Sequence, residues 1–320
     1  MGNMDKKAMD ATVLITGANG FIGSHTVLLL ESLGYRVVPL DVVPRSKELS
    51  LLPVKTATQL LDVADFASVN SLCKKEEVTH IIHFAFPSRK EDTEVLSFYL
   101  QAMRNILDTA KETGVQRVVF SSSGAVYGQL KKEDHSLIKE DDLVAIYPAY
   151  IYRAAKILGE WVGDFYVQHQ GISFVALRFS SVYGPGLWRG LGETLKQGIL
   201  GRECRPFLTR SLDDPIYVAD VARAVHLACF CEKPLSRAYN IASDKHYDEE
   251  DLARAIRKHL PECSFTIGRN PDRVAAPHRQ RGLLDVTLAR EELGWVPEYD
   301  LDQGIAALVE WLRSVKDQLS

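Results

Sequence analysis

The strongest constraint on this chain is a repeated alternation of short apolar runs with longer amphipathic ones. Uninterrupted apolar runs such as Thr12–Thr16, His80–Phe84 and Arg117–Ser121 are typical of strands buried on both faces of a sheet. Between them lie stretches with helical spacing of apolar residues, among them Phe21–Ser32 and Glu94–Thr113. Such helices carry the chain back across the sheet, so consecutive strands run parallel. The sequence therefore predicts an α/β fold with a doubly wound parallel sheet.

The pattern loosens after about residue 180, where glycine and proline interrupt the apolar runs. We expect one main domain over residues 12–180, to which segments near 213–243 return, and a smaller C-terminal α/β lobe within residues 181–320. Residues 1–11 form a polar N-terminal extension. The other predicted strands are Arg36–Leu40 and Ser173–Leu177, and the other predicted helices are Phe66–Lys75, Tyr152–Gln168, Asp248–His259 and Leu301–Val315.

Composition argues against several classes of protein. The 320 residues are 46% hydrophobic and 25% charged, as in ordinary globular proteins, and a net charge of −4 with no long basic run argues against nucleic acid as a partner. The five cysteines show no repeated C-x-x-C spacing, so neither a disulfide framework nor a metal site is expected. Residues 1–11 lack the apolar core of a secretion signal, and no apolar stretch is long enough to span a membrane. We therefore expect a cytoplasmic protein.

A glycine-rich turn, Gly17–Gly23 (GANGFIG), joins the first predicted strand to the first predicted helix. Glycine permits a tight turn, a close approach of the backbone to a pyrophosphate, and close packing of the helix on the strand. The N-terminus of the helix adds unpaired N–H groups that attract phosphate. The turn therefore predicts a dinucleotide site, whose expected contacts are Gly17, Asn19, Gly20, Phe21, Ile22 and Gly23.

Two acidic residues beyond the glycine turn, Asp41 and Asp62, are candidates for contact with the adenosine part of the cofactor. Asp41 is an acceptor suited to the adenosine ribose, and its charge would repel the 2′-phosphate of NADP, so NAD is the expected cofactor. The alternative role of Asp41 is a helix or turn cap, and Arg45 nearby weakens the preference for NAD. Asp62, in Leu61-Asp62-Val63, is placed to reach the adenine, and a solvated loop acid is the alternative.

Three stretches together carry a resemblance to a known family: the glycine turn, Ser121–Gly128 and Tyr152–Lys156. They resemble the extended short-chain dehydrogenase/reductases, and among these the NAD-dependent epimerase/dehydratase family of the UDP-galactose 4-epimerase type. Leu177–Gly186, Ile216–Ala222 and Leu293–Pro297 extend the resemblance over nearly the whole chain.

The resemblance implies a Rossmann-type sheet with a smaller substrate-binding lobe, and hydride transfer to NAD. It also implies a homodimer paired through the helices at Glu94–Thr113 and Tyr152–Gln168. Further cofactor contacts implied by it are Val63, Phe84, Ala85, Ser121, Tyr152 and Lys156.

Tyr152 and Lys156 lie four residues apart, on one face of a predicted helix. A phenol has a pKa near ~10 and is a poor base at neutral pH unless a neighbouring cation, here Lys156, favours the phenolate. Tyr152 could then accept the proton of a secondary alcohol while Ser123, at the exit of a strand, hydrogen-bonds the same oxygen. We predict that Ser123, Tyr152 and Lys156 are catalytic, although Tyr-x-x-x-Lys by itself is more often ordinary helix surface.

The substrate side departs from the family pattern. Gly124 and Ala125 stand where the related dehydratases carry two acids, and they cannot protonate a leaving hydroxyl. Ser181 replaces an asparagine, and Asp213 replaces an arginine that clamps the substrate diphosphate. Asp213 and Asp214 would repel a diphosphate unless a cation intervened. The residues that we assign to a sugar-like substrate are Ser88, Ser181, Trp188, Arg210, Arg279 and Arg281.

Two further departures concern the cofactor side. Tyr99 stands where the helix Glu94–Thr113 normally begins with asparagine, whereas Asn105 matches the later asparagine of the family. Phe86 replaces a small residue and is expected to crowd the pocket.

Three functions remain open. The resemblance favours an NAD-dependent epimerase of a sugar or nucleotide-sugar, which acts by transient oxidation of a secondary alcohol. The departures favour the alternative, an NAD-dependent dehydrogenase or reductase of a small sugar, sugar acid or other alcohol that releases NADH. A non-catalytic dinucleotide sensor is the third reading, and the presence of all three catalytic residues argues against it.

Overall fold

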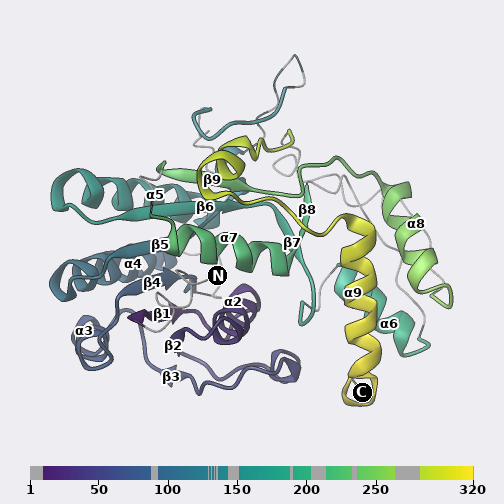
Figure 1. Cartoon of the computed structure of the whole chain (residues 1–320), viewed down its shortest axis with the longest axis horizontal. Helices are drawn as coiled ribbons and strands as arrows, with labels where there is room; N and C mark the ends of the chain where they lie inside the picture. Colours follow the sequence, from purple (N-terminus) through teal and green to yellow (C-terminus); the bar gives the residue numbers. More distant parts are fainter. Residues whose placement is uncertain are drawn as a thin grey trace.

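The central element is a seven-stranded sheet in the order β3-β2-β1-β4-β5-β6-β9 (Figure 1). The computed structural model describes residues 10–87, 93–128, 130, 132, 134, 136–142, 151–187, 190–202, 214–232, 236–263 and 282–319. All pairs of strands in the sheet are parallel, as the sequence predicts. The strands are β1 (Thr12–Thr16), β2 (Arg36–Asp41), β3 (Gln59–Leu60), β4 (His80–His83), β5 (Arg117–Ser123), β6 (Phe174–Phe179) and β9 (Ala238–Ile241); β7 (Ser181–Tyr183) pairs separately with β8 (Pro215–Tyr217).

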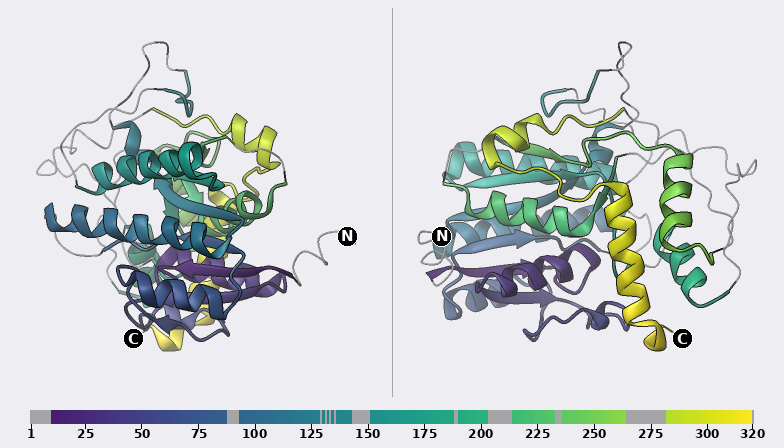
Figure 2. Two further views of the ribbon diagram at one scale, coloured as in Figure 1. Left: turned by 90° about the vertical axis from the view of Figure 1, so that its left-hand side faces the viewer. Right: turned by 45° about the vertical axis from the view of Figure 1, so that its right-hand side comes forward.

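Helices cover both faces of the sheet, which confirms the predicted doubly wound fold (Figure 2). α2 and α7 lie on one face, and α3, α4 and α5 lie on the other. α6, α8 and α9 pack together around a separate apolar cluster at one end of the sheet. The helices are α2 (Phe21–Ser32), α3 (Phe66–Lys75), α4 (Thr93–Thr113), α5 (Ile151–Gln170), α6 (Leu191–Ile199), α7 (Val218–Phe230), α8 (Glu249–His259) and α9 (Leu301–Ser314), with short turns η1 (Leu49–Leu51), η2 (Gly124–Tyr127), η4 (Ala289–Leu293) and η5 (Lys316–Gln318).

The order of the strands reverses at β1, which lies between β2 and β4. The connections that leave β1 and β4 therefore run to opposite faces of the sheet, and a crevice opens between the carboxyl ends of these two strands. In doubly wound folds this crevice is the place where ligands bind. The fold thus predicts the site at the residues that follow β1 and β4.

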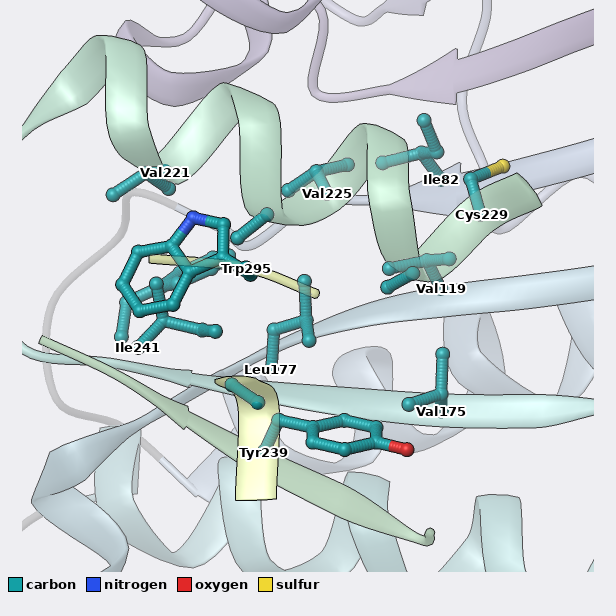
Figure 3. Packing of buried hydrophobic residues seen from close by; sticks show 14 of the residues in the cluster. Ile82, Val119, Val175, Leu177, Val221, Val225, Cys229, Tyr239, Ile241 and Trp295 are labelled. Atoms are coloured by element: carbon teal, nitrogen blue, oxygen red, sulfur yellow. The ribbon is translucent and has the colours of Figure 1, made fainter. Parts of the chain in front are cut away.

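Apolar side chains fill the space between α7 and the sheet (Figure 3). Trp295 lies in this cluster beside Val221 and is fully buried. Its indole N–H donates to the carbonyl of Asp220, 3.0 Å away, so the C-terminal Leu-Gly-Trp-x-Pro segment is tied to α7. The Asp220 carboxylate also accepts the backbone N–H groups of Glu298 and Tyr299.

β5 runs two residues further than predicted, to Ser123. Its pairing with β6 continues through Ser121, Ser122 and Ser123, so three polar residues extend a strand whose apolar run ends earlier. Ser123 is therefore the last residue of a central strand.

The C-terminal half of the chain divides between the sheet and the separate cluster. β9 joins the main sheet and α7 covers it, whereas β7 and β8 pair apart from it. The domain boundary at residue 180 stays a prediction. In the part of the chain that the structure describes, no helix has the length and apolarity needed to cross a bilayer.

Candidate functional site

The glycine turn lies in the crevice between β1 and β4. Gly17 has a φ of +69°, and a Cβ at this position would lie 2.7 Å from the backbone N of Ala85, which follows β4. A Cβ on Gly23 would lie 2.2 Å from the Gly17 carbonyl oxygen. Gly20 is the N-cap of α2, and no side chain caps the helix there. The bare backbone and the open helix end form a cradle that fits the pyrophosphate of a dinucleotide.

A Gly17→Ala substitution is expected to destabilise the protein by about 1–3 kcal/mol and to weaken NAD binding at least tenfold. The new Cβ would meet the Ala85 backbone, and alanine tolerates the positive φ poorly. Urea unfolding and calorimetric titration with NAD would measure the two effects. Gly34→Ala is the control, because Gly34 also has a positive φ of +84° but its Cβ would meet nothing within 4 Å. Equal NAD affinity in both variants would contradict the assignment of the turn.

Asp41 closes the turn from the end of β2. One carboxylate oxygen accepts the backbone N–H of Asn19 at 2.9 Å, and the other accepts those of Val42 and Val43 at 2.8 and 3.3 Å. The side chain of Asn19 donates to the Val43 carbonyl at 2.7 Å and accepts the Thr58 hydroxyl at 2.7 Å. Asp41 therefore does cap a turn, and this role places its carboxylate beside the dinucleotide cradle.

Arg45 is within electrostatic reach of Glu31 on α2. Burial lowers the pKa of its guanidinium, and the charge of Glu31 opposes that effect. The Glu31 carboxylate is itself held by the backbone N–H groups of Lys55 and Thr56. Arg45 thus has an acidic neighbour on the helix, while its Nε and one terminal nitrogen are buried and have no hydrogen-bond partner among the described residues.

The loop after β3 is fixed to α4. Asp62 is exposed and accepts the backbone N–H of Ala64 at 2.9 Å. The Asn105 side chain donates to the carbonyls of Val63 and Ala64 at 3.1 and 2.8 Å. Asn105 therefore holds this loop in place, a role that its position in the sequence did not reveal.

Lys156 joins α5 to the end of β5. It is 3% exposed, and its Nζ donates to the Ser121 carbonyl at 2.7 Å and to the Ser121 hydroxyl at 3.3 Å. Ser123 lies two residues further along β5, and Tyr152 lies one helical turn before Lys156. Both therefore stand near the carboxyl edge of the sheet, close to the crevice. Ser123 Oγ accepts the N–H of Ala125 at 3.1 Å, so its own O–H is not used in that bond.

Four aromatic rings surround the Lys156 ammonium group. Burial lowers the pKa of Lys156 to about 7, and the charge of Glu160 opposes that shift. Both the charged and the neutral amine are therefore accessible near neutral pH. Gly159 makes room for two of the aromatic side chains, because a Cβ there would lie 2.6 Å from Phe120 Cζ and 3.0 Å from Tyr99 Oη. The rings are those of Phe86, Tyr99, Phe120 and Tyr152, with centroids 5.2, 5.7, 5.1 and 5.5 Å from Nζ.

A buried polar network supports the serines of β5. Arg178 on β6 donates to both oxygens of Glu160 at 2.9 and 2.6 Å and to the hydroxyl of Tyr127 at 2.6 Å. Ser122 donates to the same carboxylate. Sequence reasoning missed Glu160. The signal was Arg178, because a cation within an apolar, buried strand requires an anionic partner.

The residues assigned to substrate are mostly not described by the structure. Ser181 is exposed on β7. Asp214 is buried, and its carboxylate accepts the backbone N–H of Leu284 at 2.9 Å, so a bond within the protein accounts for this acid. Five of the assigned residues lie outside the described part of the chain: Ser88, Trp188, Arg210, Arg279 and Arg281. Asp213 lies outside it as well.

Comparison with known proteins shows what this chain is similar to. The model of the NAD dependent epimerase/dehydratase family matches residues 13–242. A putative UDP-glucose 4-epimerase of Methanocaldococcus jannaschii is 29% identical over 315 residues, which cover 94% of this chain and 98% of that protein. The mitochondrial L-threonine 3-dehydrogenase of Bos taurus is 24% identical over 266 residues, or 78% of this chain and 69% of that protein. The crystal structure of UDP-glucose 4-epimerase from Thermotoga maritima, with UDP-glucose, has a TM-score of 0.82 at 24% identity, and the match covers 95% of this chain and 99% of that one.

Proposed function

This chain belongs to the NAD-dependent epimerase/dehydratase family, and we propose that it epimerises a sugar, most directly one carried on a nucleotide, through transient oxidation of a secondary alcohol. The observation that carries the proposal is the bond from Lys156 to Ser121, which holds α5 against the end of β5. That bond brings the helix of Tyr152 to the strand of Ser123, and only β4 lies between this strand and β1, which leads into the glycine turn. The epimerase relatives, one of them solved with UDP-glucose, support a nucleotide-sugar as substrate.

In the proposed mechanism Tyr152 accepts the proton of the substrate alcohol. The Lys156 ammonium favours the phenolate of Tyr152, and the Ser123 hydroxyl donates to the substrate oxygen as it becomes a carbonyl. NAD, held by the glycine turn, Asp41 and Lys156, would supply the hydride acceptor. Once the carbonyl has turned its other face, return of the hydride to the carbonyl carbon and of the proton from Tyr152 to its oxygen would complete the inversion. The assignment of Asp62, Val63, Phe84, Ala85 and the substrate residues belongs to the same proposal.

The test is to incubate the purified protein with UDP-glucose and to follow UDP-galactose by NMR. We expect interconversion without net formation of NADH. We also expect NAD in near-stoichiometric amount when the protein, purified without added nucleotide, is denatured, because an epimerase regenerates its cofactor in every turnover. Absence of bound NAD together with absence of conversion of nucleotide-sugars would contradict the proposal.

A dehydrogenase is the second candidate. The Phe86 ring packs edge-on against the Tyr152 ring, with centroids 5.1 Å apart, and this crowding limits the room in which a sugar could turn. The similarity to a threonine dehydrogenase points in the same direction. Formation of NADH with a free sugar, a sugar acid or another alcohol, and without epimerised product, would establish this function instead.

We also propose a homodimer that pairs through α4 and α5. Trp161 and Phe165 on α5 are 66% and 47% exposed, although both are large and apolar. Sedimentation is expected to show a dimer at micromolar concentration, and Trp161→Glu with Phe165→Glu should shift it to monomer. Leu60→Glu is the control, because Leu60 is 63% exposed on the edge strand β3, away from α5. A monomeric parent protein, or a double variant that stays dimeric, would exclude this interface.

The cytosol is the proposed location. Within the described part of the chain Cys73, Cys229 and Cys231 are free thiols, and free thiols suit a reducing compartment. Within the described ranges there is also no cluster of three or more potential metal ligands.

A further inference from the structure

A short segment between β7 and α6, Gly184–Leu187, lies where the cofactor-binding elements meet the C-terminal helices. We call it the strap. A Cβ on Gly186 would lie 2.4 Å from Leu49 Cδ2, so space alone favours glycine there. The φ of +86° at Gly186 favours glycine independently. On its other side, a Cβ on Gly184 would lie 2.5 Å from Val218 Cγ1 at the start of α7. The strap is therefore tightly enclosed.

His25 on α2 holds the middle of the strap. Its Nε2 lies 2.8 Å from the Pro185 carbonyl oxygen, which can only accept, so this nitrogen carries the hydrogen. Burial lowers the pKa of His25 to about 4, so the ring is neutral at physiological pH and keeps its single N–H on that bond. The ring also stands edge-on to Phe21, with centroids 5.5 Å apart and an interplanar angle of 82°. Phe21 is the first residue of α2 and lies within the glycine turn.

Two elements of the proposed cofactor site, the glycine turn and the loop after Asp41, thus reach the same strap. The glycine turn reaches it through Phe21 and His25, and the loop that leaves Asp41 reaches it through Leu49. A Cβ on Gly192 of α6 would lie 2.0 Å from the Leu187 carbonyl oxygen, so the strap lies against α6, whose Leu195 is fully buried in one apolar cluster with Leu308 of α9. A ligand that fixes the turn would therefore act on the C-terminal helices through contacts that already exist.

We propose that His25 is a positioning residue that couples NAD binding at the glycine turn to the conformation of the strap and α6. NAD would then order the substrate side of the site. This inference deepens the proposed function and rests on NAD binding at the turn. Because coupling between two sites is reciprocal, NAD and substrate should each strengthen the binding of the other, by about 5- to 150-fold for a coupling of ordinary size.

Hydrogen–deuterium exchange of the full chain, with and without NAD, tests the coupling in the absence of any substrate. We expect NAD to slow amide exchange in α6 of the parent protein about tenfold, a change within the usual range of coupling. His25→Phe keeps the ring against Phe21 but removes the N–H donor, and should lose this effect while still binding NAD. His25→Gln keeps a donor of similar reach and should retain the effect.

Each outcome of the experiment is informative. NAD binding with no change in α6 exchange of the parent protein, or a His25→Phe protein that responds like the parent, would overturn the inference alone. Failure of the parent protein to bind NAD would overturn the proposed function as well. If His25→Phe does not fold, His25→Asn takes its place, because its shorter amide cannot reach the Pro185 carbonyl. A purely structural His25 would lower stability in these variants and leave the NAD-dependent change in α6 intact.

Discussion

Tyr152→Phe is expected to lower kcat about 10²- to 10⁴-fold, the usual contribution of a general acid–base group, and to leave the affinity for NAD nearly unchanged. The substitution removes only the hydroxyl that would exchange the proton of the alcohol. The phenyl ring can keep its edge-on contact with Phe86 and its place beside the Lys156 ammonium group. The loss should therefore appear in turnover rather than in cofactor binding.

Steady-state kinetics on the compound that the parent protein converts, together with calorimetric titration of NAD, would measure both quantities. Tyr166→Phe is the matched control, because Tyr166 is also on α5 and its hydroxyl donates to Asp108 at 2.6 Å, away from Lys156. The control should retain nearly full activity. Full turnover by Tyr152→Phe would remove Tyr152 from the mechanism, whichever of the two candidate functions is correct.

Lys156→Met is expected to abolish turnover and at the same time to stabilise the folded protein. Burial lowers the pKa of Lys156 from 10.5 to about 7, so folding either buries a cation or removes its proton. A lysine whose pKa is lower in the folded state destabilises that state most strongly below pH 7, and the penalty disappears as the pH rises towards 10.5. Because methionine does not titrate, the stability of Lys156→Met relative to the parent should be more favourable at pH 6 than at pH 9 by about 3 kcal/mol.

Urea unfolding of both proteins at the two pH values would measure the difference. Lys75→Met on α3 is the control, because the Lys75 side chain is 77% exposed and its removal should change stability by no more than about 0.5 kcal/mol. A Lys156→Met protein that is less stable than the parent at pH 6 would show that the rings and Ser121 stabilise the cation by more than burial penalises it. Stability given up at this position would be typical of an active site.

Local patterns in the sequence were sufficient for the fold. The strand at Thr12–Thr16 and the helices at Phe21–Ser32 and Phe66–Lys75 have the predicted bounds. Each depends on the spacing of apolar residues within one segment, and the parallel arrangement follows from their alternation. The predicted bounds are wrong by a few residues where backbone pairing between strands continues beyond the apolar run, as at Ser122 and Ser123 of β5.

The sequence by itself determined the order of the elements, the glycine turn after the first strand, and Tyr152 and Lys156 on one face of a helix, because each of these depends on neighbours within a few residues. Only the tertiary structure decided the other surroundings of Lys156, because the rings of Phe86, Tyr99 and Phe120 come from the exit of β4, from α4 and from β5. It also paired Glu160 with Arg178 and brought His25 to Pro185, 160 residues away. Such contacts depend on how whole helices and strands pack against one another, and the spacing of residues along one segment carries no record of that packing.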